Sequence, residues 1–170
     1  MKSSMKIALA AFAVSSVLSM SAQAVEKNIT VTASIDPTLN MLQADGTELP
    51  ASVAMVYNPS IGLQPVTIST KIYSNTATKD VAISTLGTPA LMNTTDSAQT
   101  IPLVVNYNGK PLSATATTLA AASIFTDKSG ASVSMPLVIS ATNTGHATWT
   151  QGDYQGVVSL LLQQPTPVAP

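Results

Sequence analysis

The sequence predicts an all-β fold, a sandwich of immunoglobulin-like type, and three observations support this prediction. Short runs rich in Val, Ile and Thr alternate apolar and polar residues, which is the periodicity of a strand with one buried face. Gly, Asn, Asp and Pro residues that favour turns separate these runs at roughly ten-residue spacing. No stretch shows a convincing helical pattern. About seven or eight short strands with frequent turns are typical of a two-layer sandwich.

A long alternating run at Val25–Asp36 predicts a strand at the start of the mature chain. One of its faces carries the mostly apolar set Val25, Lys27, Ile29, Val31, Ala33 and Ile35. Pro37 then ends the run, because proline lacks the backbone N–H that would continue a ladder. No hairpin turn joins this strand to the next segment. We therefore expect it to pair with a sheet edge that belongs to another molecule.

Further strands are expected along the rest of the chain, and turn residues separate most of them. Asp45-Gly46 and Asn108-Gly109 supply the positive φ angles that tight turns need. The segment Leu112–Ala122 is ambiguous, because Leu119–Ala122 favours a helical turn whereas the flanking threonines disfavour a long helix. The expected strands are Thr38–Gln43, Ser52–Tyr57, Val66–Tyr73, Lys79–Leu86, Ile101–Tyr107, Val133–Ala141 and Asp153–Gln163.

Two of these strands carry specific expectations about their neighbours. Pro102 predicts that Ile101–Tyr107 either is an edge strand or truly begins at this proline, its second residue. Asp153–Gln163 is apolar on both faces, so we expect it to lie deep in the sandwich. Thr142–Gln151 between the last strands reads as a long polar loop that carries His146 and Trp149.

The first 24 residues have the pattern of a secretory signal. Lys2 and Lys6 give a basic start, Ile7–Met20 is apolar, and small residues precede a cleavage site between Ala24 and Val25. A transmembrane helix is the alternative, but the apolar stretch is shorter than the ~20 residues that a bilayer requires. We expect a soluble mature chain that reaches an extracytoplasmic location.

Charge and composition exclude several classes of function. The chain has a formal net charge of −1 and contains no arginine, so we expect no nucleic-acid partner. It has no cysteine, and His146 is its single histidine, so we expect no metal, no cofactor and no catalytic residue. Ser140, His146 and Asp153 are the alternative, a catalytic triad, but no Gly-x-Ser-x-Gly motif supports it.

Several blocks of the sequence resemble the major pilins of the colonisation-factor and cable-pilus group, which belong to the alternate chaperone–usher pathway of Gram-negative bacteria. The mature start and the C-terminal strand carry the most specific resemblance. Thr76 departs from the pattern, because the usual residue there is acidic. The matching blocks are Val25–Pro37, Leu42–Gly46, Leu49–Pro50, Tyr73–Lys79 and Gly152–Leu160.

The resemblance implies a major structural subunit of a surface fimbria that supports adhesion to host cells. In such a family each subunit is an incomplete immunoglobulin-like sandwich with a hydrophobic groove where one strand is missing. A periplasmic chaperone fills the groove first, and at the outer-membrane usher the N-terminal extension of the next subunit replaces it. The implied partners are therefore identical subunits in a head-to-tail fibre, the chaperone, the usher and a tip adhesin.

On this basis residues 25–37 are the expected donor strand, 38–163 the pilin domain and 164–170 a Pro-rich tail. Burying the four large donor side chains would contribute roughly 6–12 kcal/mol before the cost of ordering the arm. We expect Lys27 at the groove mouth with its ammonium in water. The residues expected to border the groove and face the chaperone are Tyr154, Gly156, Val158, Leu160 and Leu162.

Two alternatives stay open at this point. The chain would also suit a minor fimbrial subunit, or a shaft subunit with lectin-like binding in which Trp149 and Tyr154 form an aromatic platform. The Pro-rich tail, residues 164–170, departs from the family pattern. Either it is an inert extension, or it alters chaperone release or packing along the shaft.

Overall fold

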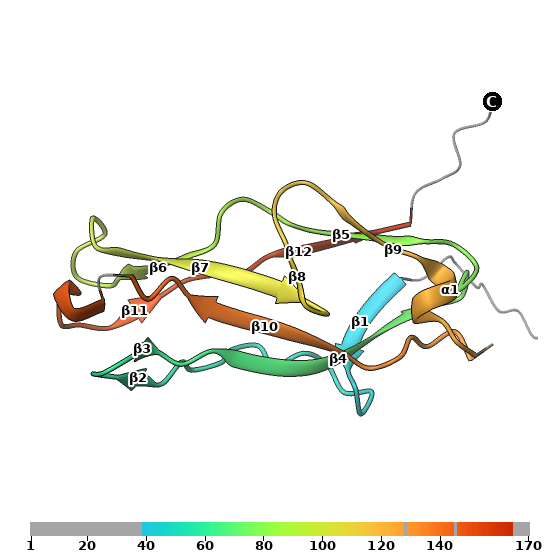
Figure 1. Cartoon of the computed structure of the whole chain (residues 1–170), viewed down its shortest axis with the longest axis horizontal. Coiled ribbons are helices and arrows are strands. Elements are labelled where there is room, and N and C mark those ends of the chain that lie inside the picture. Colours follow the sequence, from blue (N-terminus) through green and yellow to red (C-terminus); the bar gives the residue numbers. More distant parts are fainter. Residues whose placement is uncertain (1–38, 128, 145, 165–170) are drawn as a thin grey trace, which may run out of the picture. The chain divides into compact units, whose positions relative to one another are not determined.

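The computed structural model describes residues 39–127, 129–144 and 146–164, all within one compact unit, Ile35–Pro170. This part of the chain is nearly all β, with one helical turn, α1 (Ala121–Ile124), and one 3₁₀ turn, η1 (His146–Thr148) (Figure 1). The expectations for residues 1–38 and 165–170 lie outside the described residues. The strands are β1 (Leu39–Gln43), β2 (Tyr57–Asn58), β3 (Gly62–Leu63), β4 (Val66–Ser74), β5 (Val81–Thr85), β6 (Ala90–Asn93), β7 (Thr100–Tyr107), β8 (Lys110–Pro111), β9 (Thr117–Leu119), β10 (Met135–Ala141), β11 (Tyr154–Gln155) and β12 (Leu160–Gln163).

The strands form two main antiparallel sheets. The larger sheet has the order β1-β4-β10-β7-β6-β11, and β8 pairs with β7 through the Asn108-Gly109 turn. The smaller sheet has the order β12-β5-β9, and β2 and β3 form a separate hairpin. In Figure 1, β4, β10 and β7 run one above another, and β12, β5 and β9 lie together at the upper right. The expected all-β sandwich of immunoglobulin-like type is therefore confirmed.

A single apolar core draws on both sheets. Ile72 of β4 and Ile83 of β5 are fully buried, as the alternating pattern of each strand predicts. The neighbours of Ile83 in β5 are buried as well, so this strand is covered on both faces, which its sequence pattern did not indicate. The other buried members of the core are Met41, Val81, Val105, Tyr107, Leu119, Ala121, Ile124, Phe125, Met135 and Leu137.

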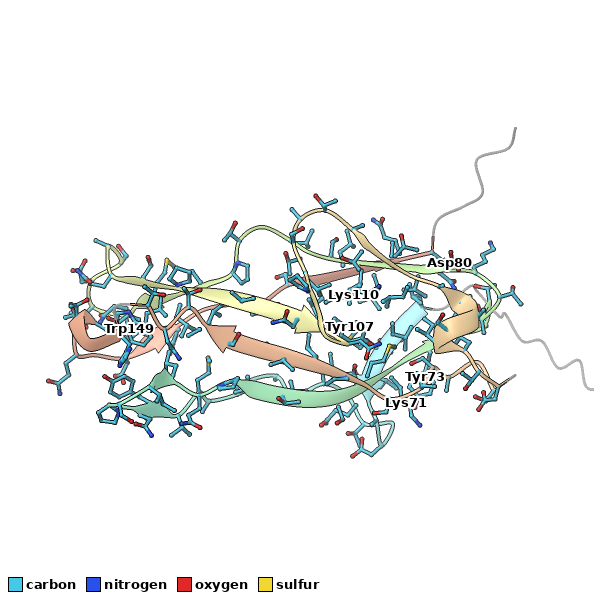
Figure 2. The ribbon with its side chains drawn as sticks, viewed as in Figure 1. Lys71, Tyr73, Asp80, Tyr107, Lys110 and Trp149 are labelled. Carbon is cyan, nitrogen blue, oxygen red and sulfur yellow. The ribbon has the colours of Figure 1, made fainter. Side chains whose placement is uncertain are left out.

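The core contains one polar cluster that is satisfied internally. Tyr107 is 1% exposed, and its hydroxyl hydrogen-bonds with the Thr70 hydroxyl at 3.2 Å (Figure 2). The Thr70 hydroxyl also donates to the carbonyl of Met135 at 2.9 Å. Burial raises the pKa of Tyr107 above 10.0, although the bond to Thr70 opposes this shift. The cluster joins β4, β7 and β10 across the interior of the larger sheet.

β7 is an interior strand, so the expectation from Pro102 is wrong. It pairs with β10 on one side and with β6 on the other, and Pro102 lies within its paired length. The backbone N–H of Thr142 donates to the Pro102 carbonyl at 2.9 Å, just after β10 ends. Pro136 of β10 has the corresponding position just beyond the end of β7, where the backbone N–H of Asn108 donates to the Pro136 carbonyl at 2.9 Å. Each proline therefore lies opposite the first residue beyond the end of the neighbouring strand, where its carbonyl still accepts a bond and its missing N–H costs only the return bond at the end of the ladder.

Two other expectations are corrected or refined by the structure. Ser52–Tyr57 is not a strand, because only Tyr57 joins β2, and Val56 is 68% exposed. The helical alternative for Leu119–Ala122 is close to the observed turn α1, which begins two residues later. The backbone N–H of Ala121 donates to the Asp80 carboxylate at 2.8 Å, so a distant residue caps this turn (Figure 2).

Candidate functional site

β12 and β1 are the outermost strands at one side of the two sheets. Among the described residues, β12 pairs only with β5 and β1 pairs only with β4. Residues of β1 and β12 come within 8 Å of each other between Cα atoms, but the two strands belong to different sheets. We call the side of β1 away from β4 and the side of β12 away from β5 the edge pair. Unpaired strand edges are templates for the addition of a further strand.

The edge of β1 is partly satisfied by its own chain. Ala44 donates its backbone N–H to Ser69 of β4 at 2.8 Å, so the alternate residues Met41 and Gln43 point their N–H groups away from β4. The N–H of Met41 donates to the side chain of Asn40 at 2.8 Å. The N–H of Gln43 donates to the Thr47 carbonyl at 2.8 Å. A strand that pairs with β1 must therefore displace the Asn40 side chain from Met41.

Apolar side chains of the last strand region lie beneath the edge of β12. Val158, Leu160 and Leu162 alternate along the chain, are half-buried, and pack against the core. The structure thus brings together three of the five residues predicted to border a groove. Because each keeps part of its surface exposed, this end of the core retains apolar area that a further segment can cover.

The other two predicted residues have different surroundings. Gly156 lies against β6, and a Cβ at this position would overlap the carbonyl oxygen of Ala90. Tyr154 is half-buried and donates its hydroxyl to the carbonyl of Thr150 at 2.8 Å. Gly156 also lines a surface hollow of about 490 Å³, together with Thr88, Ala90, Met92, Gln155 and Val157.

The expectation that Asp153–Gln163 lies deep in the sandwich is wrong. The structure divides this segment into β11 and β12, which pair with β6 and β5, and none of its residues is fully buried. Val157 is 79% exposed. Apolar residues on both faces usually indicate burial on both sides. Here, among the described residues, no strand lies beyond β12, which explains why these side chains are only half covered.

The end of β12 is fastened by a residue that the sequence did not single out. Gln164 accepts hydrogen bonds from the hydroxyls of Ser74 and Thr76 at 3.2 and 2.5 Å. Its amide nitrogen donates to the carbonyls of Thr76 and Lys79 at 3.1 and 3.4 Å. These residues lie in the Tyr73–Lys79 block. A lone Gln before a proline carries no sequence signal for such a contact.

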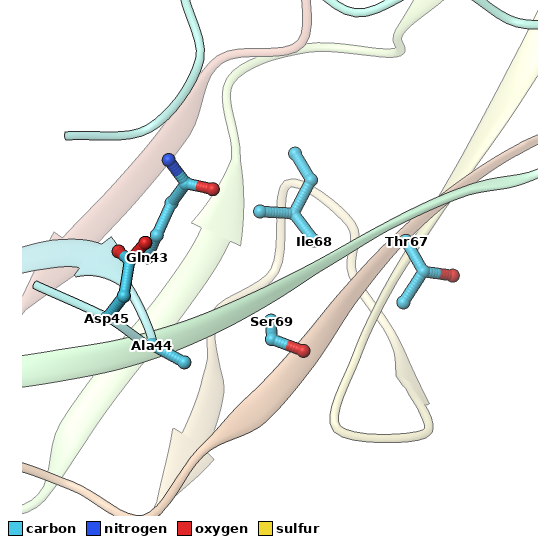
Figure 3. A pocket seen from close by; sticks show the side chains of 6 residues that line it. All are labelled: Gln43, Ala44, Asp45, Thr67, Ile68 and Ser69. Atoms are coloured by element: carbon cyan, nitrogen blue, oxygen red, sulfur yellow. The ribbon is translucent and has the colours of Figure 1, made fainter. Parts of the chain in front are cut away.

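A shallow hollow of about 280 Å³ lies where β1 ends (Figure 3). Figure 3 shows Gln43 and Asp45 on one side of it, with Thr67 and Ile68 of β4 on the other. The Asp45 carboxylate accepts bonds from the hydroxyl and the backbone N–H of Thr47 at 2.6 and 2.9 Å, and these bonds lower its pKa. This carboxylate therefore shapes a turn, and the hollow offers no enclosed site.

The residues considered for a lectin-like platform and for a catalytic triad make other contacts in the structure. Trp149 packs beside Tyr57 and His146, with ring centroids 6.4 and 6.2 Å away, and the hydroxyl of Tyr154 is bonded elsewhere. His146 Nδ1 lies 3.0 Å from the carbonyl of Asn143. The Ser140 hydroxyl donates to the carbonyl of Val104 at 3.4 Å, so its proton is not directed at His146.

Two further features are absent from the described part of the chain. It contains no group of three or more His, Cys, Asp or Glu residues that could hold a metal ion. None of its helices is long and apolar enough to cross a bilayer.

Comparisons with known proteins point in one direction. Residues 25–163 match the model of the family described as CS1 type fimbrial major subunit. The chain is 42% identical over 150 residues to a CFA/I fimbrial subunit of Escherichia coli O78:H11 (strain H10407 / ETEC), in an alignment that covers 85% of this chain and 88% of the relative. It is 39% identical over 153 residues to a CS1 fimbrial subunit of Escherichia coli, covering 86% and 90%.

A solved structure gives the same result for the fold. The CooA pilin subunit from enterotoxigenic Escherichia coli superposes with a TM-score of 0.70 at 34% sequence identity. The superposition covers 76% of this chain and 89% of that chain.

Proposed function

Because the chain belongs to the CS1 type fimbrial major subunit family, we propose that Val25–Asp36 is a donor strand that completes the sandwich of a neighbouring copy. The chain is a structural subunit of a bacterial surface fimbria, and the resemblance identified from the sequence is confirmed. Its family is one of structural proteins that polymerise into fibres, and it is not a family of enzymes. The proposal concerns the segment that makes the contact and the surface that receives it.

The observation that carries the proposal is the half-covered apolar row beneath β12. Val158, Leu160 and Leu162 pack against the core but stay partly exposed, and no described strand pairs with the free edge of β12. The predicted arm carries the matching pattern, with Ile29 and Val31 at its centre. Two apolar rows of period two that face each other are the arrangement that strand addition requires.

The length of the proposed donor strand is also compatible with the lengths of β1 and β12. The arm of twelve residues spans about 40 Å at ~3.3 Å per residue, which exceeds the length of either edge strand. The arm precedes Leu39, the first residue of β1, so it joins the domain beside the edge pair. A donor that enters the neighbour's edge pair makes a head-to-tail contact that does not close, and repetition of this contact gives a fibre.

The same surface supports the proposal that a chaperone acts during export. Before polymerisation the edge pair and its apolar row would be open to edge-to-edge aggregation. We propose that a periplasmic chaperone covers them after removal of residues 1–24, and that an outer-membrane usher exchanges the chaperone for the arm of the next subunit. A tip adhesin and support of host-cell adhesion complete the proposed assembly.

Addition of a free Val25–Pro37 peptide to the subunit released from its chaperone tests the donor assignment. We expect the melting temperature of the subunit to rise, because the peptide binds the folded state only. A peptide with Asp in place of Ile29 and Val31 serves as the control and is expected to have no effect. An unchanged melting temperature with the native peptide would show a self-complete fold and contradict the assignment.

A further inference from the structure

The side chain of Gln164 joins the two sheets at one end of the edge pair. Its oxygen accepts from two hydroxyls, those of Ser74 and Thr76, and its nitrogen donates to two carbonyls, those of Thr76 and Lys79. An amide is the side chain that offers an acceptor and two donors together. The four contacts therefore use both acceptor positions and both donors of this group. We call this set of contacts the Gln164 clasp.

The clasp links β12 to β4, the strand that pairs with β1. Gln164 follows β12 directly, so it fixes the end of that strand. Ser74 is 4% exposed and is the last residue of β4, where it lies opposite Leu39, the first residue of β1. One side chain thus links the end of β12 to the strand that holds the beginning of β1.

This link holds the end of β12 against the end of β4. A donor strand that adds to β12 hydrogen-bonds along the free edge of β12, so it needs that edge to be in place along its whole length. Fraying of β12 at this end would lose the last of these bonds. An edge that is held in place is a form of preorganisation, which lowers the cost of binding.

We propose that Gln164 is a positioning residue for donor-strand binding, and that the clasp holds the free edge of β12 in the position that the donor requires. This inference rests on the proposed function of Val25–Asp36. It also assigns a role to the Tyr73–Lys79 block, which the proposed function leaves without one. The clasp acts on the lifetime of the contact between subunits rather than on the chemistry of the donor.

Thr76 is the specific partner within this clasp. Its hydroxyl makes the shortest contact to the Gln164 oxygen, at 2.5 Å. An ionised acidic residue at position 76 only accepts hydrogen bonds, so it would repel that oxygen. Positions 76 and 164 are therefore coupled, and Thr76→Asp is expected to open the clasp as Gln164→Ala does.

Fibres assembled from the full chain test the inference through their dissociation into subunits in guanidinium. With Gln164→Ala we expect dissociation at least about tenfold faster than in wild type, because several hydrogen bonds are lost. Gln163→Ala is the matched control, since it removes the same side chain from the preceding, exposed residue and should leave the rate unchanged. Equal rates in wild type and Gln164→Ala would overturn the proposal.

Hydrogen exchange separates positioning from general loss of stability. The clasp predicts faster exchange of β5 and β12 amides in Gln164→Ala, with β7 and β10 unchanged. Uniformly faster exchange would overturn the positioning role. If Gln164→Ala does not accumulate, Gln164→Glu keeps both acceptor contacts but loses the donors to Thr76 and Lys79, and is also expected to dissociate faster. A rate equal to wild type in that variant counts against the proposal.

The variant Ile29→Asp, in the proposed donor strand, distinguishes a failure of the clasp proposal from a failure of the donor assignment. If Ile29→Asp still forms normal fibres, the donor assignment falls and the clasp proposal falls with it. If Ile29→Asp forms none while Gln164→Ala fibres behave as wild type, only the clasp proposal is overturned.

Discussion

Gly156 lies so close to β6 that the carbonyl oxygen of Ala90 occupies the space that a Cβ atom at position 156 would need. β11, which ends one residue before Gly156, pairs with β6 at Tyr154 and Gln155. The last strand region crosses here from the larger sheet to the smaller one, in which β12 pairs with β5. A side chain at position 156 would push this crossing away from β6.

We therefore expect Gly156→Ala to destabilise the folded domain by about 1–3 kcal/mol, the range for overpacked sites. The neighbour Gln155 is exposed, and Gln155→Ala serves as the control with an expected change below about 0.5 kcal/mol. Denaturant unfolding of the two variants and of wild type measures both changes. Equal stability of Gly156→Ala and wild type would show that the backbone can move at this position without cost.

Polar substitution on the apolar face of Val25–Asp36 tests the donor-strand assignment through fibre formation in cells. Ile29→Asp or Val31→Asp would place a charge against the apolar row of β12, so we expect no fibres and an intact complex with the chaperone. Thr30→Asp, on the opposite face, is the control and should still polymerise. Electron microscopy of cells that also express chaperone and usher, with co-purification of the chaperone complex, gives both readouts. Normal fibres from both apolar-face variants would count against the assignment.

The buried hydroxyl of Tyr107 predicts a stability loss at alkaline pH. Its folded pKa is raised above 10.0, so the folded state holds this proton more tightly than the unfolded state. The resulting contribution is fully present below pH 10 and is lost as pH rises through the higher folded pKa. Tyr107→Phe should cost about 1 kcal/mol at pH 7, from the bond to Thr70, and this difference should shrink above pH 10.

Denaturant unfolding between pH 7 and pH 11 measures the difference between wild type and Tyr107→Phe. The exposed Tyr57 provides the control, because Tyr57→Phe removes a hydroxyl that is not buried in the core. A constant difference across this pH range would mean that Tyr107 does not couple its ionisation to folding.

Asp80 predicts a helix-cap effect across the chain. Its carboxylate accepts the first backbone N–H of α1, while residue 120, the N-cap, is an alanine that makes no side-chain cap bond. Asp80→Ala should cost about 1 kcal/mol of stability, whereas Asp80→Asn keeps an acceptor and should cost less. Thermal unfolding of the two variants compares them directly. If both variants lose the same stability, the carboxylate acts by its charge rather than as a cap.

Much of the sandwich could be predicted from residue patterns. Val66–Tyr73 alternates strictly, and β4 occupies nearly the same residues with Thr70 and Ile72 turned into the core. Asn108-Gly109 predicts a hairpin, and both residues have positive φ in the turn before β8. Each of these signals is local, because periodicity and turn chemistry act over a few residues.

Predictions that depended on neighbours were less successful. Pro102 indicated an edge, but the end of β10 nearby accommodates it within the sheet. Leu160 and Leu162 indicated a buried strand, yet they are half-buried because the described sheet ends at β12. A sequence reports which surfaces are apolar, whereas the tertiary arrangement decides whether the same molecule covers them.

The sequence by itself determined the β class, the position of most strands and the resemblance to a pilin family, because these depend on local periodicity and on recognisable blocks. Only the tertiary structure decided which strands are left at an edge, why Gly156 must lack a side chain, and that Gln164 joins the end of β12 to Thr76. Thr76 and Gln164 are 88 positions apart in the chain, and no local sequence pattern predicts a contact at that separation. Hydrogen bonds and close packing of this kind exist only once the two sheets have come together.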